Sequence, residues 1–302
     1  MTRKAPKNVS ASVRQRLLNK SESEERPFNE LLQYYAMERF LYRLSKSEHA
    51  EKFVLKGALA LRVWDSPEFR PTMDIDLLGR TSNREIEIVK QIEDIISVPV
   101  ESDGLIYNCD SIRAEEITEE AEYSGIRLKL LANLGSARIN MQIDIGFGDA
   151  MVPEPELSKF PSVLDYPAPQ LWCYSRESTI AEKLEAMIKL RMLNSRMKDF
   201  YDIWMLSRYF DFDGETLKEA VVRTMNSRGT KIPEKIEAFS VEFSQAKQNQ
   251  WIAFKRRFVQ VDLPLDFKTI IEAVVPFLDP IIESIKKSTI PPRLWAAPGP
   301  WQ

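Results

Sequence analysis

The sequence is poor in histidine and cysteine. Its 302 residues contain one histidine, His49, and two cysteines, Cys109 and Cys173. A single histidine argues against serine–histidine–aspartate hydrolysis, a zinc site built on several histidines and general-base histidine chemistry. The cysteines lack the spacing of a metal site, so we expect two small buried thiols in a reducing cytoplasm. A catalyst built from carboxylates, lysines and a hard metal ion is compatible with this composition.

Long apolar runs and an excess of positive charge are also missing. No run approaches the ~20 apolar residues needed to cross a bilayer, and the N-terminus lacks the apolar stretch of a signal peptide. The net charge is −3, so any surface that attracts nucleic acid must be local. With 44% hydrophobic and 29% charged residues, the chain can form a core and a soluble surface. These features predict a cytoplasmic protein without a membrane partner.

The N-terminal segment is a block of positive charge. Residues 1–20 hold six basic residues and no acid, and the acidic patch Glu22–Glu25 follows before Pro27. Such blocks are usually solvated, so we predict a basic, mobile arm over residues 1–27. Contact with a phosphate backbone is the alternative.

Residues 28–165 mix helical and strand patterns. The apolar spacing predicts helices over 28–46, 58–63 and 83–96 and strands over 53–55 and 74–78. Residues 105–147 read as β structure with a hairpin turn at Gly135–Ser136. Prolines then indicate a linker from about residue 151 to 166.

The remainder of the chain is predicted to be helical, over 177–193, 198–209, 214–226, about 234–258 and 266–287. The proline-rich tail, residues 291–302, is not expected to form regular structure. A β-rich half followed by a helical half predicts an α+β fold. Its core would span residues 28–165, followed by a helical domain over 166–290.

Three aspartates are the candidates for metal ligands. Asp74 and Asp76 alternate along a predicted strand, so both side chains leave the same face, roughly 6–7 Å apart. Two acids so placed repel each other unless cations lie between them, and two Mg²⁺ ions about 3.5–4 Å apart would suit the gap. Asp144 lies in a later apolar strand and could face the same ions if the strands pair. This pattern predicts metal-dependent phosphoryl transfer from a nucleoside triphosphate (NTP), with Mg²⁺ or Mn²⁺ as cofactor.

The residues just before these aspartates favour a nucleotide site. Gly57 opens a helix after Lys56 and can offer backbone N–H groups to phosphates without an intervening side chain. An Asp-x-Asp pair alone also occurs on solvent-facing strand edges. Lys56–Gly57 upstream and a third aspartate in an apolar strand favour the metal site.

The helical half contributes further candidates. Lys183 lies at the edge of the apolar stripe of helix 177–193, whereas Glu182, Glu185 and Lys189 are expected to point away from it. Lys183 could simply extend its ammonium to solvent. The functional alternative is a cation that holds the β- and γ-phosphates of the nucleotide.

Asp199 and Asp202 are three residues apart on helix 198–209, so their side chains share one face. Asp199 could be a first-turn acid favoured by the helix dipole. In the functional alternative, this stripe covers the nucleotide site and one of the two acids contacts Lys183, Arg196 or the base. A further segment, Trp251–Phe258, mixes aromatic and basic residues and predicts an amphipathic helix, with an RNA-facing surface as the alternative.

Five motifs in order resemble the AbiEii/AbiGii toxin family of nucleotidyltransferases: Glu38–Ser45, Phe53–Ala58, Arg70–Leu77, Glu177–Ala186 and Arg196–Asp202. The resemblance implies a polymerase-β-like nucleotidyltransferase core with a mixed sheet, followed by a helical C-terminal domain. It also implies a bacterial toxin, active in phage defence or growth arrest, with a cognate antitoxin encoded nearby. Some members transfer nucleotides from an NTP to the 3′ end of tRNA.

Carried over by motif, Asp74 and Asp76 are metal ligands, and Lys183 and Asp199 are the functional pair of the helical half. The glycine motif reads Gly57–Ala58 where many nucleotidyltransferases have Gly-Ser or Gly-Gly, so a hydroxyl near the phosphate is lost. Thr72 stands where relatives often carry serine, and its hydroxyl is expected to serve nucleotide binding.

Together these observations predict a Mg²⁺-dependent nucleotidyltransferase toxin that transfers a nucleoside monophosphate to an RNA 3′ end, with tRNA the expected acceptor. One alternative is a binding module that recognises a nucleotide without chemistry. Another is nucleotidyl transfer to a small molecule or to a protein hydroxyl.

Overall fold

The computed structural model describes residues 8–65, 71–119, 123–256, 258 and 263–302. The chain divides into two compact units. The first, here called the sheet unit, includes the described residues up to Asp65, Pro71–Gly148 and Glu156–Cys173. The second, the helical unit, includes Asp149–Pro155 and Tyr174–Gln302. The boundary predicted from sequence is 165/166. It lies instead at 173/174, because residues 170–173 form a strand of the sheet unit.

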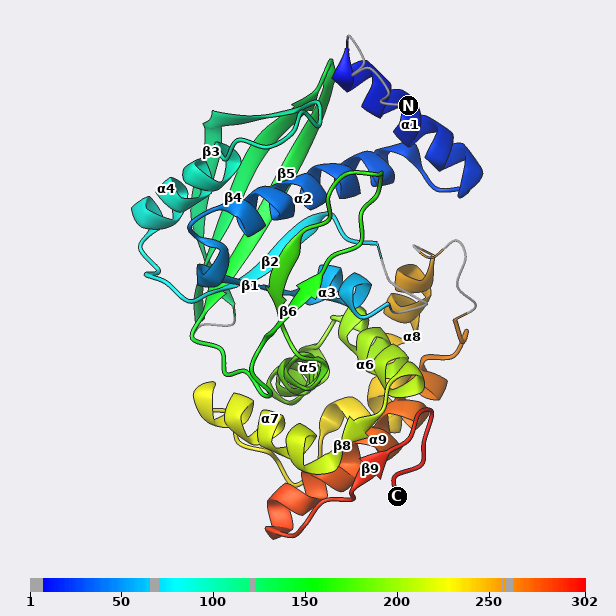
Figure 1. The fold of residues 1–302 in the computed structure, drawn as a ribbon. Coiled ribbons are helices and arrows are strands. Elements are labelled where there is room, and N and C mark those ends of the chain that lie inside the picture. Colours follow the sequence, from blue (N-terminus) through cyan, green and yellow to red (C-terminus); the bar gives the residue numbers. More distant parts are fainter. Residues whose placement is uncertain (1–7, 66–70, 120–122, 257, 259–262) are drawn as a thin grey trace. The chain divides into compact units, whose positions relative to one another are not determined.

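A seven-stranded mixed sheet forms the first unit, in the order β3-β4-β5-β2-β1-β7-β6 (Figure 1). The strands are β1 (Phe53–Lys56), β2 (Asp74–Gly79), β3 (Leu105–Glu119), β4 (Tyr123–Leu134), β5 (Ala137–Phe147), β6 (Glu156–Lys159) and β7 (Gln170–Cys173). β2 pairs with β5 and β1 with β7 in parallel, and the other neighbours are antiparallel. The predicted α+β class with a mixed sheet is confirmed, as is the turn at Gly135–Ser136.

The sheet has one face in the core. Alternate residues of β4 and β5 are buried, as the period of two residues in a strand requires. Helices α2 (Phe28–Lys46) and α4 (Glu85–Ile96) pack on this side, and Figure 1 shows both lying against the same face of β3–β5. A short helix, α3 (Gly57–Val63), joins β1 to the segment before β2. The opposite face of β3–β5 carries mostly polar side chains, with Ile106 and Leu131 as exceptions.

The segment predicted to be a basic arm contains a helix, α1 (Val9–Ser23). Asn8 caps it by accepting a hydrogen bond from the Ala11 N–H at 3.0 Å. Val13 and Leu17, four residues apart, are fully buried in the core of the sheet unit. Because charged residues surround this apolar pair in the sequence, a packed helix was not predicted here. Arg3, Lys4 and Lys7 lie outside the described residues.

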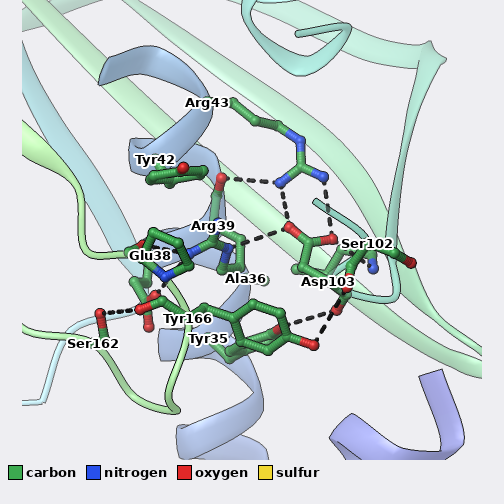
Figure 2. A network of polar contacts seen from close by, with 12 residues as sticks. Tyr35, Ala36, Glu38, Arg39, Tyr42, Arg43, Ser102, Asp103, Ser162 and Tyr166 are labelled. Carbon is green, nitrogen blue, oxygen red and sulfur yellow. Dashed lines mark hydrogen bonds and ion pairs between the residues drawn. The ribbon is translucent and has the colours of Figure 1, made fainter. Parts of the chain in front are cut away.

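A buried polar network fixes α2 (Figure 2). Arg39 and Arg43 both point toward Asp103, at 3.2 and 2.6 Å. Glu38 accepts a hydrogen bond from the Val163 N–H at 2.6 Å. These contacts tie α2 to the loop before β3 and to the loop between β6 and β7. The charged residues of the motif Glu38–Ser45 therefore position backbone segments within the sheet unit.

Five helices build most of the helical unit: α5 (Arg176–Leu190), α6 (Met197–Tyr209), α7 (Gly214–Ser227), α8 (Val241–Lys255) and α9 (Phe267–Lys287). All five were predicted. The helix expected from about residue 234 begins at Val241, because the Ser240 hydroxyl caps it by accepting from the Phe243 N–H at 3.1 Å. Among the described residues, no helix is both long and apolar enough to span a bilayer.

The proline-rich tail contains a short strand, although no regular structure was predicted for it. Its strand β9 (Leu294–Trp295) pairs with β8 (Phe212–Asp213) in a two-stranded sheet. The Trp295 indole N–H donates to the Ser207 carbonyl at 2.6 Å, and Trp301 donates to the Phe277 carbonyl at 2.9 Å. The tryptophans anchor the segment despite its prolines.

The two thiols differ. Cys173 is buried as expected, but Cys109 is exposed. Cys109 lies on β3, which is an edge strand of the sheet and has an irregular register between Asn108 and Arg113. The expectation of two buried thiols was therefore wrong for Cys109.

Candidate active site

The three predicted metal ligands meet on two adjacent strands. β2 and β5 pair in parallel, with Asp76 opposite Asp144 and Asp74 opposite Gln142. One carboxylate oxygen from each aspartate lies within 4.8 Å of the others, and all three residues are partly buried. We call Asp74, Asp76 and Asp144 the acidic cluster. Strand pairing thus brings together residues that are about 70 positions apart in the chain.

An arginine that was not predicted from sequence holds one member of this cluster. Arg127 lies on β4 directly opposite Asp144. Its guanidinium donates to both carboxylate oxygens, Nε to Oδ1 at 2.9 Å and Nη2 to Oδ2 at 2.7 Å. The Gln142 amide also donates to Oδ2, at 3.1 Å. These hydrogen bonds fix the Asp144 carboxylate and raise the pKa of Arg127, so one of the three negative charges is balanced by the fold itself.

Thr72 and Gly57 both contact the acidic cluster. The Thr72 hydroxyl donates a short hydrogen bond to Asp74 Oδ1, and its backbone N–H donates to the Tyr34 hydroxyl at 3.2 Å. Gly57 begins α3 with φ +68°, and a Cβ at this position would lie 1.9 Å from Asp76 Oδ2. A glycine is needed here both for its backbone conformation and for space. Lys56, at the end of β1, is paired with Asp76 in the strand register.

The donor set of the acidic cluster fits a hard divalent cation. Mg²⁺ and Mn²⁺ prefer carboxylate and other oxygen ligands, and three carboxylates converge within 4.8 Å. Asp74, Asp76 and Asp144 would hold the ion, with Thr72 orienting the Asp74 carboxylate. The charge of such an ion would offset the repulsion among the three acids.

A second group of potential ligands, Glu48, His49 and Asp94, fits a metal less well. The Lys52 ammonium lies 3.0 Å from His49 Nδ1 and donates to it. The ring proton is then on Nε2, which points to Asp94 at 3.1 Å. Both ring nitrogens are engaged in hydrogen bonds, so this group is better described as a hydrogen-bonded chain.

In the helical unit, Lys183 of α5 lies between Asp199 and Asp202 of α6. Its ammonium is 2.8 Å from an oxygen of each carboxylate. All three side chains are buried or nearly so, at 12%, 6% and 1% exposure. Lys183 therefore does not extend to solvent, and both predicted aspartates contact it. The group carries a formal charge of −1.

Arg228, just beyond α7, binds three carboxylates that belong to the same unit. It lies 2.7 Å from Asp149, 3.4 Å from Glu182 and 3.0 Å from Glu185. Glu185 was expected to point away from the core and is instead buried. An acid can be buried when a cation pairs with it. The partner in this case is 43 residues distant and was not predictable from the helix pattern.

The aromatic residues of Trp251–Phe258 face the core of the helical unit. Trp251 is fully buried, stacks on Phe267 at 5.3 Å between ring centroids and donates to the Pro264 carbonyl at 2.9 Å. Residues 251–255 of this segment lie in α8, and its buried tryptophan is not available to stack on RNA bases. Arg257 lies outside the described residues.

A family model described as the nucleotidyl transferase AbiEii toxin of type IV toxin–antitoxin systems matches residues 39–273. Among solved structures, a candidate nucleotidyltransferase from H. pylori is similar, with 16% identity, 83% of this chain and 94% of that chain covered, and a TM-score of 0.45. JHP933 from Helicobacter pylori is similar with 13% identity, 83% and 90% coverage and a TM-score of 0.45. No curated protein matches the chain.

Proposed function

The chain belongs to the AbiEii family of nucleotidyltransferase toxins, and from this premise we propose that it transfers a nucleoside monophosphate from an NTP to the 3′ end of an RNA, with tRNA the expected acceptor. Membership makes it a nucleotidyltransferase of a toxin–antitoxin system with an antitoxin partner. The observation that carries the proposal is the acidic cluster on β2 and β5.

In the proposed reaction the acceptor 3′-hydroxyl oxygen attacks the α-phosphorus of the NTP. A new P–O bond forms, the bond to the β-phosphate breaks, and pyrophosphate leaves. Asp74 and Asp76 would hold Mg²⁺ or Mn²⁺, which when bound neutralises charge on the triphosphate and the developing transition state. Asp144 would complete the metal site and orient or deprotonate the acceptor hydroxyl, and Arg127 fixes the orientation of its carboxylate.

Further residues enter the proposal through the family motifs. We propose that backbone N–H groups at Lys56–Gly57 bind phosphate, as the start of a helix favours. Lys183 and Asp199 match the functional pair of the family, and Asp202 shares the same buried ion-pair group. We propose that this group serves nucleotide binding.

The test is transfer of label from α-labelled NTPs, each in turn, to total RNA by the purified protein, with Mg²⁺, Mn²⁺ or EDTA. We expect label at RNA 3′ ends, concentrated in tRNA, that depends on the divalent ion and is abolished in Asp76→Asn. The matched control is Glu85→Gln, an exposed acid on α4, which should label RNA as the unaltered protein does. Full labelling by Asp76→Asn would refute the assignment of the site.

Other results of the same experiment identify the alternatives. NTP binding that survives EDTA without any modified RNA would indicate a non-catalytic nucleotide-binding module. Label in the small-molecule or protein fraction would indicate a different acceptor. Co-expression with the neighbouring gene tests the antitoxin: we expect it to relieve growth arrest caused by the unaltered chain.

A further inference from the structure

The face of β3–β5 that carries Asp144 is solvent-facing and mostly polar, with Ile106 and Leu131 as apolar members. Residues that alternate with it along β4 and β5 are buried in the core, among them Leu128, Leu130, Met141 and Ile143. The opposite side chains remain exposed or partly exposed. We call the following residues the open face: Arg113, Glu115, Arg127, Lys129, Asn133, Arg138, Asn140 and Gln142.

The strand register places the open face in line with the acidic cluster. Asp74 pairs with Gln142, Gln142 with Lys129, and Lys129 with Arg113. Residues paired across strands share a face, and adjacent strands lie about 4.8 Å apart, so Lys129 is about 10 Å and Arg113 about 14 Å from Asp74 at the backbone. A row of cations therefore leads away from the three carboxylates across β4 and β3.

Positive charge also lies along β5, at Arg138. Arg138 is exposed and pairs with Asn133 of β4, and Asn140 lies between Arg138 and Gln142 on the same side of the strand. This path carries the Arg138 guanidinium followed by the amides of Asn140 and Gln142. The chain as a whole has a net charge of −3, so the grouping of four cations on one face is local and not a consequence of composition.

Two of these cations, Arg113 and Lys129, are available to an external anion, whereas Arg127 is held by Asp144. Lys129 pairs with Glu115 at 2.8 Å, but both side chains are about half exposed, at 55% and 50%. Ion pairs at such exposure are worth only about 0–1 kcal/mol, so a phosphate can replace the carboxylate at small cost. Arg113 donates to two backbone carbonyls, Asp110 at 2.9 Å and Ile112 at 2.7 Å. Because carbonyls are neutral, these bonds orient the Arg113 guanidinium without cancelling its charge.

We propose that the open face binds the phosphate backbone of the acceptor RNA behind its 3′ end, so that the terminal hydroxyl reaches the acidic cluster. The inference rests on the proposed function, since it names the surface that holds the acceptor. Arginine, lysine, asparagine and glutamine are the side chains that contact phosphates and sugars. The open face contains no aromatic side chain, whereas protein-binding hot spots are enriched in tyrosine and tryptophan, so RNA fits it better than a protein partner.

The test is binding of fluorescently labelled bulk tRNA without NTP, measured across a series of salt concentrations. Neutralising both Arg113 and Lys129, as Arg113→Gln/Lys129→Gln, removes two phosphate contacts. Each contact contributes about 0.7–0.9 to the slope of log K against log salt, so the slope should fall by about 1.4–1.8. If the affinities are equal at 1 M salt, binding at 0.1 M weakens about 25- to 60-fold.

The matched control is Lys90→Gln, an exposed lysine on α4, on the other side of the sheet, which should leave the slope unchanged. In the transfer assay the double variant should show a raised KM for RNA, with the KM for NTP and kcat at saturating RNA retained. Those retained values also show that the variant is folded.

An unchanged salt slope and affinity in the double variant would overturn the proposed surface. So would unchanged tRNA binding accompanied by loss of antitoxin binding, which would make the open face a protein interface. Because binding is measured without NTP, failure of the proposed transfer reaction can be distinguished from failure of the proposed RNA-binding surface. If the protein binds tRNA through this face but labels no RNA, the transfer reaction is contradicted and the assignment of the RNA-binding surface stands.

Discussion

Replacement of Gly57 by alanine should both destabilise the sheet unit and displace the Asp76 carboxylate. The residue has φ +68°, and the added Cβ would lie 1.9 Å from Asp76 Oδ2 and 2.6 Å from its Cγ. Contacts this short do not occur, so either the carboxylate or the start of α3 must move. Either movement would disturb the position of Asp76, which we assign to metal binding.

The expected cost follows from two contributions. A non-glycine residue in the left-handed region costs about 1–2 kcal/mol, and overpacking a filled site costs about 1–3 kcal/mol. The sum, about 2–5 kcal/mol, is a large part of the ~5–15 kcal/mol that stabilises a typical domain. Gly148 is the matched control, because it has φ +78° and a Cβ added there would meet nothing within 4 Å. Gly148→Ala should therefore carry only the conformational cost.

The assay is urea unfolding of both variants alongside label transfer to RNA. We expect Gly57→Ala to be about 1–3 kcal/mol less stable than Gly148→Ala, since that difference isolates the steric contact. A displacement near 1 Å at a catalytic group can lower a rate about 100-fold, so we expect a loss of that order in Gly57→Ala alone. Equal unfolding free energies, or full transfer activity in Gly57→Ala, would show that a Cβ at position 57 does not displace Asp76.

Three further predictions concern buried charges. Burial raises the pKa of Glu38 to about 7 from its ordinary 4.5, so the folded state holds the proton more tightly than the unfolded state. The unfolding free energy should therefore fall, on the order of 3 kcal/mol, as pH rises from about 4.5 to 7, and urea unfolding of Glu38→Gln should lack that fall. Lys183→Met leaves two buried aspartates without their cation and should cost about 3–5 kcal/mol in thermal unfolding; a variant as stable as the unaltered protein would contradict this. Arg127→Gln leaves the charge of Asp144 unbalanced, so its melting temperature should be lower without a divalent ion and should rise more steeply with Mg²⁺; an Mg²⁺ response equal to that of the unaltered protein would contradict this.

The elements that were predictable from sequence are those in which the local pattern and the tertiary contacts agree. The apolar period of 28–46 matches α2 because that helix buries most of its surface in the core. The alternation in residues 137–147 matches β5, whose inward residues are buried and whose outward residues are polar. In β5 the periodicity of the sequence reflects burial directly, whereas in α2 every residue from 31 to 44 is buried, charged side chains included.

Other features depended on partners far along the chain. Residues 9–23 looked like a solvated arm because of the charge around them, yet two apolar residues one helical turn apart are enough to bury one side of α1. Glu185 looked exposed because an unpaired acid avoids the core. Its partner Arg228 becomes visible only when α7 is packed against α5. Composition and periodicity carry no information on such pairings.

The candidate active site also depends on contacts between residues far apart in the chain. Asp74 and Asp76 could be assigned to one face of a strand from their spacing alone, but the position of Asp144 required that β5 pair with β2 in one register. A shift of one residue would turn Asp144 to the core face. The same register sets Arg127 against Asp144 and Lys129 against Gln142, so the ion pair and the row of cations cannot vary independently of the acidic cluster. The register of β5 against β2 and β4 therefore determines the proposed metal ligands, the arginine that holds one of them, and the surface proposed for the acceptor.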